Sequence, residues 1–229
     1  MAAFTTFVGS RLRAGYYPAD PSNYTRGRTD EISKIIVHHM AGRNTAKGCG
    51  EVFATPGRNG SAHYGIGYDG EIGQYISEAD TAWDSPQYKT GVSIETSNDE
   101  TGGEWHVSDA SLLSLIRLIA DIADRHGLFP LTVGVNLAYH SMYAATVCPG
   151  DYLRSKMQYI ADSANELIVL RRSAACDNTP ADWAAEAVDW AVVNGIMRGD
   201  EKGNLRLRDA VTREEMCVMM KRGCAAKEG

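Results

Sequence analysis

The sequence predicts an α/β protein with a central mixed β-sheet flanked by helices, followed by a small all-α helix-loop-helix module. Two observations support this. Residues 26–172 alternate short β-branched runs with helical periodicity, whereas only helical patterns follow residue 173. The chain has 229 residues, which exceeds the usual domain size of about 150. We therefore expect a first domain over 1–172, a linker over 173–179 and a module over 180–229.

Three segments of the first domain are typical of strands. KIIVHH, residues 34–39, is a short apolar, β-branched run that suits a buried strand. Residues 63–76 contain two alternating runs around Asp69 and Gly70, which predicts a hairpin because Asp-Gly favours a tight turn. GVSIET, residues 91–96, is the third such segment and is expected to form another strand.

Two long helices are expected in the same domain. Between Asp109 and Gly127 the apolar residues recur at helical spacing, with Ser108 or Asp109 as the N-terminal cap and Gly127 as the stop. The second helix should run over about 151–170.

The module contains signals for two more helices. Thr179 is a cap followed by a proline at the first helical position, and Gly195 ends that helix. Thr212 and Glu215 have the spacing of a capping box, and Gly223 is expected to end the last helix. At about 50 residues, such a module is marginally stable unless it packs on the first domain or on copies of itself.

Composition excludes several classes of function. The formal net charge is -6 and the pI is near 5.5, so nothing favours binding to nucleic acid or an anionic membrane. No apolar run is long enough to span a membrane, and residues 1–15 lack the pattern of a secretory signal. We therefore expect synthesis in the bacterial cytoplasm without a signal peptide.

The cysteines do not suggest a disulfide framework. There are five of them, an odd number, and none has the paired spacing of a structural metal site. Cys217 and Cys224, two turns apart on the last predicted helix, are expected to be core thiols.

Histidines and one cysteine carry the first chemical signal. His38 and His39 end the first strand, and because side chains alternate along a strand, only one of them can enter a given site. His140 and Cys148 lie in a loop-like stretch with seven residues between them. Imidazole and thiolate suit zinc, and two histidines with one cysteine leave a fourth position open, as in catalytic sites. The alternatives are polar residues at a strand exit and a buried, small apolar cysteine.

Five motifs follow one another along the first domain. They are IIVHHMAG (35–42), SAHYGIGYDGEIGQYI (61–76), TAWD (81–84), GVSIET (91–96) and the segment from His140 to Cys148-Pro-Gly. In this order they resemble the zinc-dependent N-acetylmuramoyl-L-alanine amidases, which include the phage lysozyme-type amidases and the catalytic peptidoglycan recognition proteins. The resemblance implies their fold. Residues 21–34 also resemble the lead-in of endolysins from phages of Gram-positive bacteria.

The resemblance assigns roles to individual residues. It implies that His38, His140 and Cys148 bind Zn²⁺, and that Glu95 is the general base and then the general acid. Thr146 corresponds to a position that contacts the developing oxyanion, where a neutral hydroxyl can donate one hydrogen bond. No organic cofactor is implied.

Other positions match the family less closely. Ala62 stands where the lysozyme-type members carry a catalytic tyrosine, so a tyrosine-based mechanism is not expected and proton transfer is assigned to Glu95. His63 is expected to line the substrate groove or to support the metal ligands, although a packing role is equally open. Trp83 is a candidate groove wall, with a core position as the alternative. His39 is expected to face away from the metal or to support its ligands.

The C-terminal module resembles one S-layer homology repeat over residues 183–220. Such repeats bind secondary cell-wall polymers, and the resemblance makes Arg213 the candidate for an anionic sugar. Residues 205–208 depart from the expected aromatic-x-Pro pattern. Because only one repeat is visible, a wall-binding module, a trimer, a dimer and a spacer all stay open.

The combined prediction is a bacteriolytic, antimicrobial endolysin of phage type. It would cleave the amide bond between N-acetylmuramic acid and L-alanine of peptidoglycan, reaching the cell wall after release from the host cytoplasm. The expected partners are peptidoglycan and an anionic wall polymer. The alternative is a non-catalytic peptidoglycan-binding protein on the same fold, and a recycling enzyme is disfavoured by the extra module. Host range and stem-peptide preference stay open.

Overall fold

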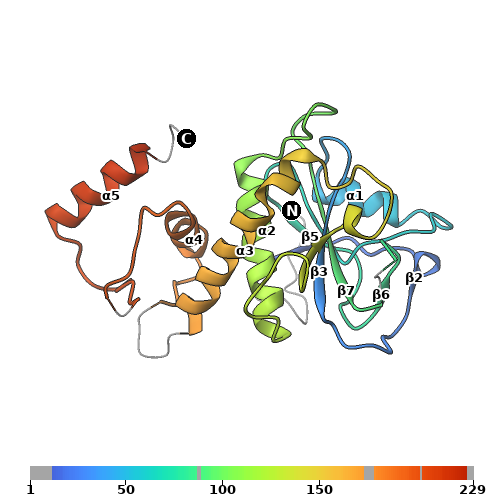
Figure 1. Ribbon diagram of the computed structural model, residues 1–229, viewed down its shortest axis with the longest axis horizontal. Coiled ribbons are helices and arrows are strands. Elements are labelled where there is room, and N and C mark those ends of the chain that lie inside the picture. The colour runs from blue at the N-terminus through green and yellow to red at the C-terminus, as the bar shows by residue number, and fades with distance from the viewer. Residues whose placement is uncertain (1–11, 87–88, 173–177, 202, 226–229) are drawn as a thin grey trace. The chain divides into compact units, whose positions relative to one another are not determined.

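A computed structural model describes residues 12–86, 89–172, 178–201 and 203–225 (Figure 1). The chain separates into two compact units, Met1–Ala164 and Asn165–Gly229, and each is described by itself. Most of the expected linker, residues 173–177, lies outside the described residues, and so does the segment 1–11 that was inspected for a signal peptide.

The first unit is built on a six-stranded sheet with the order β1-β5-β4-β7-β3-β8. The β4–β5 pair is antiparallel and the other pairs are parallel, so the sheet is mixed, as predicted. A separate two-stranded sheet pairs β2 with β6. The strands are β1 Gly15–Tyr16, β2 Tyr24–Thr25, β3 Lys34–His39, β4 Tyr64–Ile66, β5 Ile72–Gln74, β6 Thr81–Ala82, β7 Gly91–Thr96 and β8 Leu137–Tyr139.

The predicted strands occur where the sequence places them. β3 and β7 have the expected bounds, and the apolar residues of β3 have no exposed surface because this strand lies inside the sheet. β4 and β5 form the expected hairpin, with Tyr64 opposite Gln74. Gly70, at the turn, has φ of +84°, a conformation that favours glycine.

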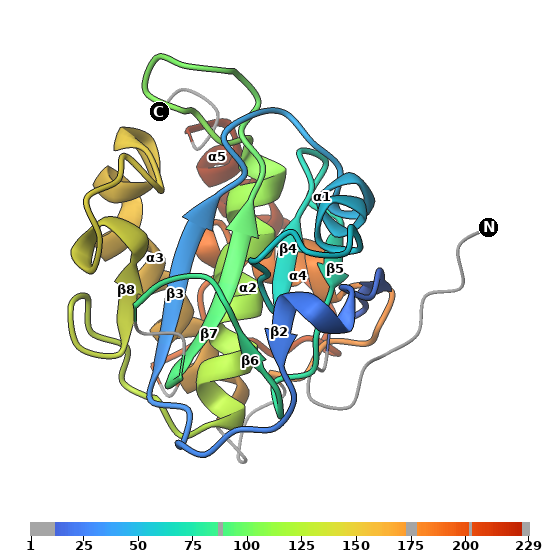
Figure 2. The ribbon, with the colours of Figure 1, turned by 90° about the vertical axis from the view of Figure 1, so that its right-hand side faces the viewer.

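Helices lie on both faces of the sheet (Figure 2). The helix α2 contacts β3, β4 and β7, whereas α1 contacts β4 and β5. The predicted cap of α2 is confirmed, since the Ser108 hydroxyl accepts a hydrogen bond from the Ser111 amide at 3.1 Å. The bounds are α1 Ala46–Phe53, α2 Asp109–Arg125 and α3 Asp151–Arg172, with short 3₁₀ turns η1 Pro21–Asn23 and η2 His140–Met142.

The two sheet faces differ in chemistry. On one face Tyr64 points toward α2, because its hydroxyl donates to Glu78 at 2.7 Å and Glu78 also binds Arg125 at the end of α2. Paired residues of neighbouring strands share a face, and successive residues alternate. His38 is paired with Glu95, and both therefore lie on the opposite face.

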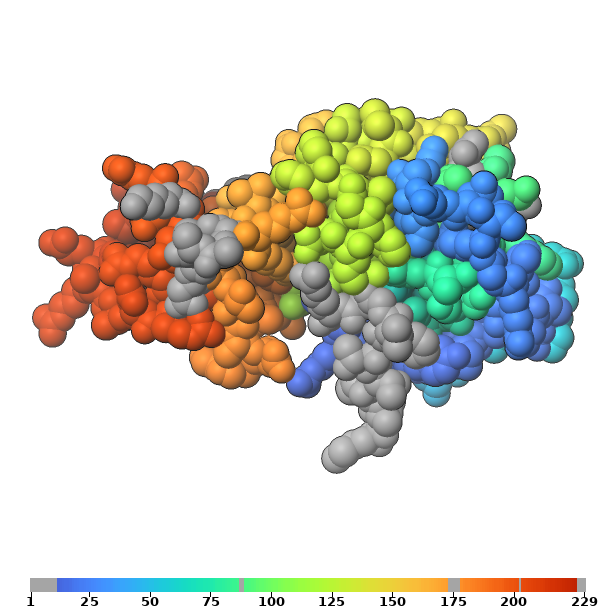
Figure 3. Space-filling view, turned by 90° about the horizontal axis from the view of Figure 1, so that it is seen from below, coloured from blue at the N-terminus to red at the C-terminus, as the bar shows by residue number. Residues whose placement is uncertain are grey.

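Hydrogen bonds and ion pairs around the buried Glu78 connect several parts of the first unit. Arg125 donates to both carboxylate oxygens of Glu78, at 2.6 and 2.7 Å. Arg28 donates to the Glu78 carbonyl at 2.6 Å, and the Gly27 amide donates to Asp80 at 2.8 Å. In Figure 3 the segment around residue 27, in blue, lies against the segment around residue 80, in blue-green. The network joins three distant parts of the sequence.

The second unit contains the end of α3 and the helices α4, Ala185–Val193, and α5, Arg213–Ala225. The predicted capping box of α5 is present: the Thr212 amide donates to Glu215 at 2.8 Å, and the Glu215 amide donates to the Thr212 hydroxyl at 3.1 Å. Gly195, with φ of +64°, follows the end of α4 as predicted.

Two predicted helix ends in this unit are wrong. α4 begins at Ala185 rather than at Pro180. Asn178 donates to the carbonyls of Leu170 and Gly203, and the Thr179 carbonyl accepts from Arg208, so tertiary contacts hold this segment outside the helix. α5 passes through Gly223 to Ala225, because a single glycine costs a helix only about 1 kcal/mol.

The prediction that Cys217 and Cys224 are core thiols is also wrong. Both are exposed on α5, whereas Cys49 and Cys148 are buried in the first unit. α5 has no buried residue, so helical spacing alone did not identify a core face. Among the described helices, none combines the length and apolar character needed to cross a membrane.

Candidate metal centre

Three neighbouring parallel strands place the candidate side chains in a row. β3 has β7 on one side and β8 on the other. His38 is level with Glu95 of β7, and Val37 is level with Tyr139 of β8, so His140 follows at the level of His38. Adjacent strands lie about 4.8 Å apart. The topology thus brings together residues more than 100 positions apart in the sequence.

The loop after η2 brings Cys148 back to the same strand ends. The Ser141 amide donates to the Cys148 carbonyl at 3.0 Å, and the His39 amide lies 3.5 Å from the Cys148 sulfur. The Thr146 hydroxyl accepts a hydrogen bond from the Cys148 amide at 3.2 Å. Backbone contacts on both sides therefore fix the thiol beside His38.

The donor atoms of His38, His140 and Cys148 all lie within 4.8 Å of one another. The Cys148 sulfur is 3.7 Å from Nδ1 of His38, and tetrahedral zinc with ordinary bond lengths separates such a pair by about 3.6 Å. The two imidazole rings are 4.6 Å apart between centroids. Two nitrogens and one sulfur at this spacing fit one zinc ion with a position left for a fourth ligand.

Burial sets the protonation states of these side chains. It lowers the pKa of His38 to about 3, with smaller contributions from His140 and His39, and it also lowers the pKa of His140. Both imidazoles are therefore neutral at pH 7 and can act as ligands. Burial, followed by the nearby Glu95, raises the pKa of Cys148 to about 12, so the thiol needs a cation beside it to ionise near neutral pH.

Glu95 occupies an unusual environment for a carboxylate. Its Oε2 atom is buried and has no hydrogen-bond partner among the described residues. Burial raises its pKa to about 8, with a further increase from Asp84 and an opposing effect from Arg58. A carboxyl group that titrates near neutrality beside a candidate metal site is suited to proton transfer.

Asp84 is the residue that the sequence analysis did not single out. It belongs to the TAWD motif, but the motif gave no sign that it would influence Glu95. Burial raises the pKa of Asp84 to about 6. Repulsion by the Asp84 carboxylate adds to the effect of burial and raises the pKa of Glu95 further.

The remaining candidates have different environments. His39 points away from the donor set and packs edge-on against Trp105, 4.9 Å away. Trp83 is 37% exposed, and its indole nitrogen donates to the Thr25 hydroxyl at 2.8 Å. His63 has no exposed surface, and its ring nitrogens contact Arg28 at 2.7 Å and Ser93 at 3.1 Å. His63 is thus a buried packing residue that does not line a groove.

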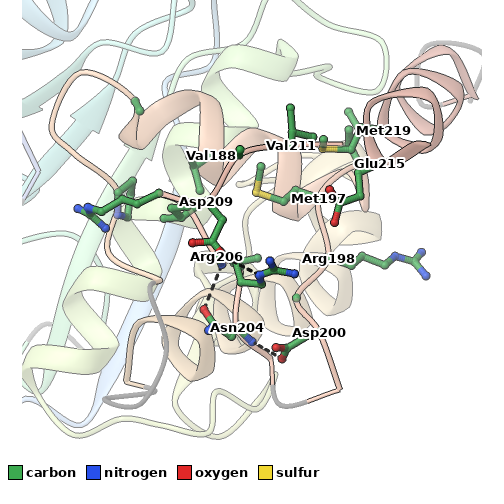
Figure 4. Close-up of a pocket in the computed structure, with 18 of the residues that line it drawn as sticks. Val188, Met197, Arg198, Asp200, Asn204, Arg206, Asp209, Val211, Glu215 and Met219 are labelled. Carbon is green, nitrogen blue, oxygen red and sulfur yellow. Dashed lines mark hydrogen bonds and ion pairs between the residues drawn. The ribbon is translucent and has the colours of Figure 1, made fainter. Parts of the chain in front are cut away.

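The second unit has a hollow of about 910 Å³ beside α5 (Figure 4). Four arginines, Arg198, Arg206, Arg208 and Arg222, line it together with acidic residues, and Arg206 is paired with Asp209 at 2.7 Å. Arg213, the expected wall-polymer ligand, begins α5 but does not line this hollow.

The fold and the donor set together define a class: a mixed-sheet α/β protein with a His-His-Cys group and a buried glutamate at the ends of parallel strands. The family model described as N-acetylmuramoyl-L-alanine amidase matches residues 28–151, more than half of the chain. The chain belongs to this family. The S-layer homology domain model matches residues 177–217.

Solved structures share the fold at low sequence identity. The structure of PlyL is 14% identical, covering 67% of this chain and 97% of its own, with a TM-score of 0.56. AmpD is 20% identical, with coverages of 64% and 93% and a TM-score of 0.52. A mutant endolysin from Bacillus subtilis is 18% identical, with coverages of 67% and 96% and a TM-score of 0.50. The comparison with curated proteins gives no match.

These findings confirm the predicted family resemblance and fold class. Family membership supports a peptidoglycan amidase type of function, and the S-layer homology match supports association with the cell wall.

Proposed function

We propose that the protein is a zinc-dependent N-acetylmuramoyl-L-alanine amidase that acts as a bacteriolytic endolysin. The observation that supports this most is the placement of Glu95 level with His38, one of three side chains whose donor atoms lie within 4.8 Å of one another. His38, His140 and Cys148 would hold the metal, and Glu95 would move the proton.

The reaction is hydrolysis of the amide between the lactyl carbonyl of N-acetylmuramic acid and L-alanine. When bound, zinc supplies Lewis-acid chemistry, polarising the scissile carbonyl and making water easier to deprotonate. Glu95 removes a proton from the attacking water while the water oxygen bonds to the carbonyl carbon. The protonated carboxyl group of Glu95 then gives that proton to the alanine nitrogen as the C–N bond breaks.

Three other side chains would contribute to binding or catalysis. The Thr146 hydroxyl, two residues before Cys148, would donate a hydrogen bond to the developing oxyanion. Trp83, at 37% exposure, offers an aromatic surface for sugar or peptide. In the second unit, Arg213 would bind an anionic wall polymer as a bidentate donor. We assign a catalytic domain to residues 1–172 and a wall-binding module to residues 180–229, whereas the two compact units divide after Ala164, within α3.

The non-catalytic alternative makes a different prediction for the same residues. A protein that only binds peptidoglycan does not need a metal-binding cysteine or a buried glutamate with a raised pKa. Here Cys148 is 9% exposed and Glu95 carries a pKa of about 8. This combination favours catalysis over binding alone.

The test is the release of free amines from purified cell walls, with and without a chelator. We expect release by the wild type, loss of release with the chelator and recovery when zinc is added back. The Cys148→Ser variant should remain inactive under all three conditions. Absence of release by the wild type, or equal release by Cys148→Ser, would exclude the zinc-amidase proposal.

A further inference from the structure

The helix α5 exposes an apolar face that its own unit does not cover. Met216 is 49% exposed and Met220 is 65% exposed, and Cys217 is also exposed. Met220 lies four positions after Met216 and three after Cys217, so the three residues fall on one side of the helix. Glu215 and Met219 lie on the side of the hollow (Figure 4), whereas Met216, Cys217 and Met220 do not line it.

Charges of opposite sign flank this apolar face. Glu214, in the first turn, and Lys221, in the third, are seven positions apart and therefore lie on the same flank of the helix. Both are exposed, and within the described residues neither side chain has a recorded hydrogen bond or ion pair. Glu215 differs, because its carboxylate accepts the hydrogen bond from the Thr212 amide.

The order of these residues is self-complementary. From residue 214 to 222 the sequence reads EEMCVMMKR, with two acids, an apolar centre and two bases. When two copies of this helix pack antiparallel along the face of Met216, Cys217 and Met220, about a two-fold axis at the level of residue 218, Met216 of one copy faces Met220 of the other. The same arrangement places Glu214 of each copy beside Lys221 of its partner, whereas Arg222 donates to the Ile196 carbonyl of its own chain.

We propose that the face of Met216, Cys217 and Met220 binds the same face of a second copy of this chain. A two-fold interface requires a surface that complements itself, so that each contact occurs twice. The acid-apolar-base order of α5 meets this requirement, whereas an unrelated partner would need no such symmetry. The apolar residues supply the burial, and the flanking charges fix the antiparallel direction.

The experiment measures the mass of the full-length chain in solution as a function of concentration, under reducing conditions that exclude disulfides. We expect a monomer of 24.9 kDa at low concentration and twice that mass at higher concentration. Met220→Glu should abolish the dimer. The matched control is Val135→Glu, because Val135 is 66% exposed on the first unit against 65% for Met220, and it should dimerise normally.

Charge reversal tests the antiparallel geometry. Glu214→Lys and Lys221→Glu should each weaken the dimer about tenfold, because attractive flanking pairs become repulsive, and the double variant should recover most of the affinity. Circular dichroism checks the helix in each variant. Both reversals oppose the helix dipole, so recovery in the double variant cannot come from helix stability.

Three results would overturn the proposal. The first is a chain that stays monomeric up to about 100 μM, where even a weak specific dimer should form. The second is an assembly of three copies, which a two-fold axis does not produce. The third is a double variant no better at dimerising than either single variant.

Discussion

Replacing Glu95 by glutamine separates the catalytic role of this residue from its cost to stability. Glutamine keeps the size of the side chain but cannot accept the proton from water. The loss of a general base typically slows an enzyme by 10²–10⁴-fold, about 3–5 kcal/mol in the barrier. Metal binding should be unchanged, because the donors His38, His140 and Cys148 are intact.

The same change should stabilise the metal-free protein at neutral pH. The pKa of Glu95 rises from 4.5 to about 8 in the folded chain, so between these values the folded state holds a proton that the unfolded state has released. Stability is therefore lost as pH rises from about 4.5 to 8. From pH 4.5 to pH 7 the loss extends over 2.5 pH units, which corresponds to at most about 3 kcal/mol of unfolding free energy. Glutamine removes this cost.

Chemical denaturation of the chelated wild type and of Glu95→Gln, at pH 4.5 and at pH 7.5, measures the effect. The difference in unfolding free energy between the two proteins should shift toward the variant by a few kcal/mol at the higher pH. Asp84→Asn is the control for the neighbouring carboxyl group, and it should shift the difference in unfolding free energy in the same direction but by less. A pH-independent difference would refute the assignment of Glu95 as a buried carboxyl group that is protonated without metal.

Three further outcomes follow from the structure. Cys148→Ser should lower bound zinc from about one equivalent to a small fraction, measured by elemental analysis after dialysis, and full retention would exclude the thiolate as a ligand. Thr146→Ala should reduce the rate on cell walls about tenfold with unchanged zinc content, since one neutral hydrogen bond is lost; an unchanged rate would remove it from the mechanism. Arg125→Met should cost about 3–5 kcal/mol of stability, because it leaves the Glu78 carboxylate buried without its bidentate partner; thermal unfolding within two degrees of wild type would contradict this.

The sequence was sufficient to predict β3 and β7, two of the three strands of the site, but it missed β8, Leu137–Tyr139, and two helix ends. β3 and β7 are buried between neighbours, so their apolar runs report burial directly, and the bounds agree. At Thr179 the local signal for a helix cap was overridden by Asn178, whose side chain binds two distant carbonyls. At Gly223 the signal for a helix stop was overridden by continuation of the helix to Ala225. Local propensity is a small free energy that a few tertiary contacts outweigh.

Some features of the candidate site could likewise be predicted from the sequence and others could not. Residue type and spacing suggested a possible zinc site, and the family resemblance then implied His38, His140 and Cys148 as its ligands. The influence of Asp84 on Glu95 could not be predicted, since it depends on a contact between a loop and a strand. For His63 the sequence left a groove position, support of the metal ligands and a packing role open, and contacts with Arg28 and Ser93 place the side chain in the interior. Exposure of Cys217 and Cys224 depends on what packs against α5, which periodicity does not reveal.

The central claim is that this chain cleaves one particular amide bond, and mass spectrometry of a peptidoglycan digest tests it most directly. Purified cell walls would be treated with the zinc-loaded protein, and the soluble products analysed beside those of Glu95→Gln. We predict stem peptides with a free amino-terminal L-alanine, glycan strands with intact lactyl carboxylates and no new reducing sugar ends, with at least about 100-fold less product from the variant in the same time. Peptides cut at any other bond, or new reducing ends, would contradict the account.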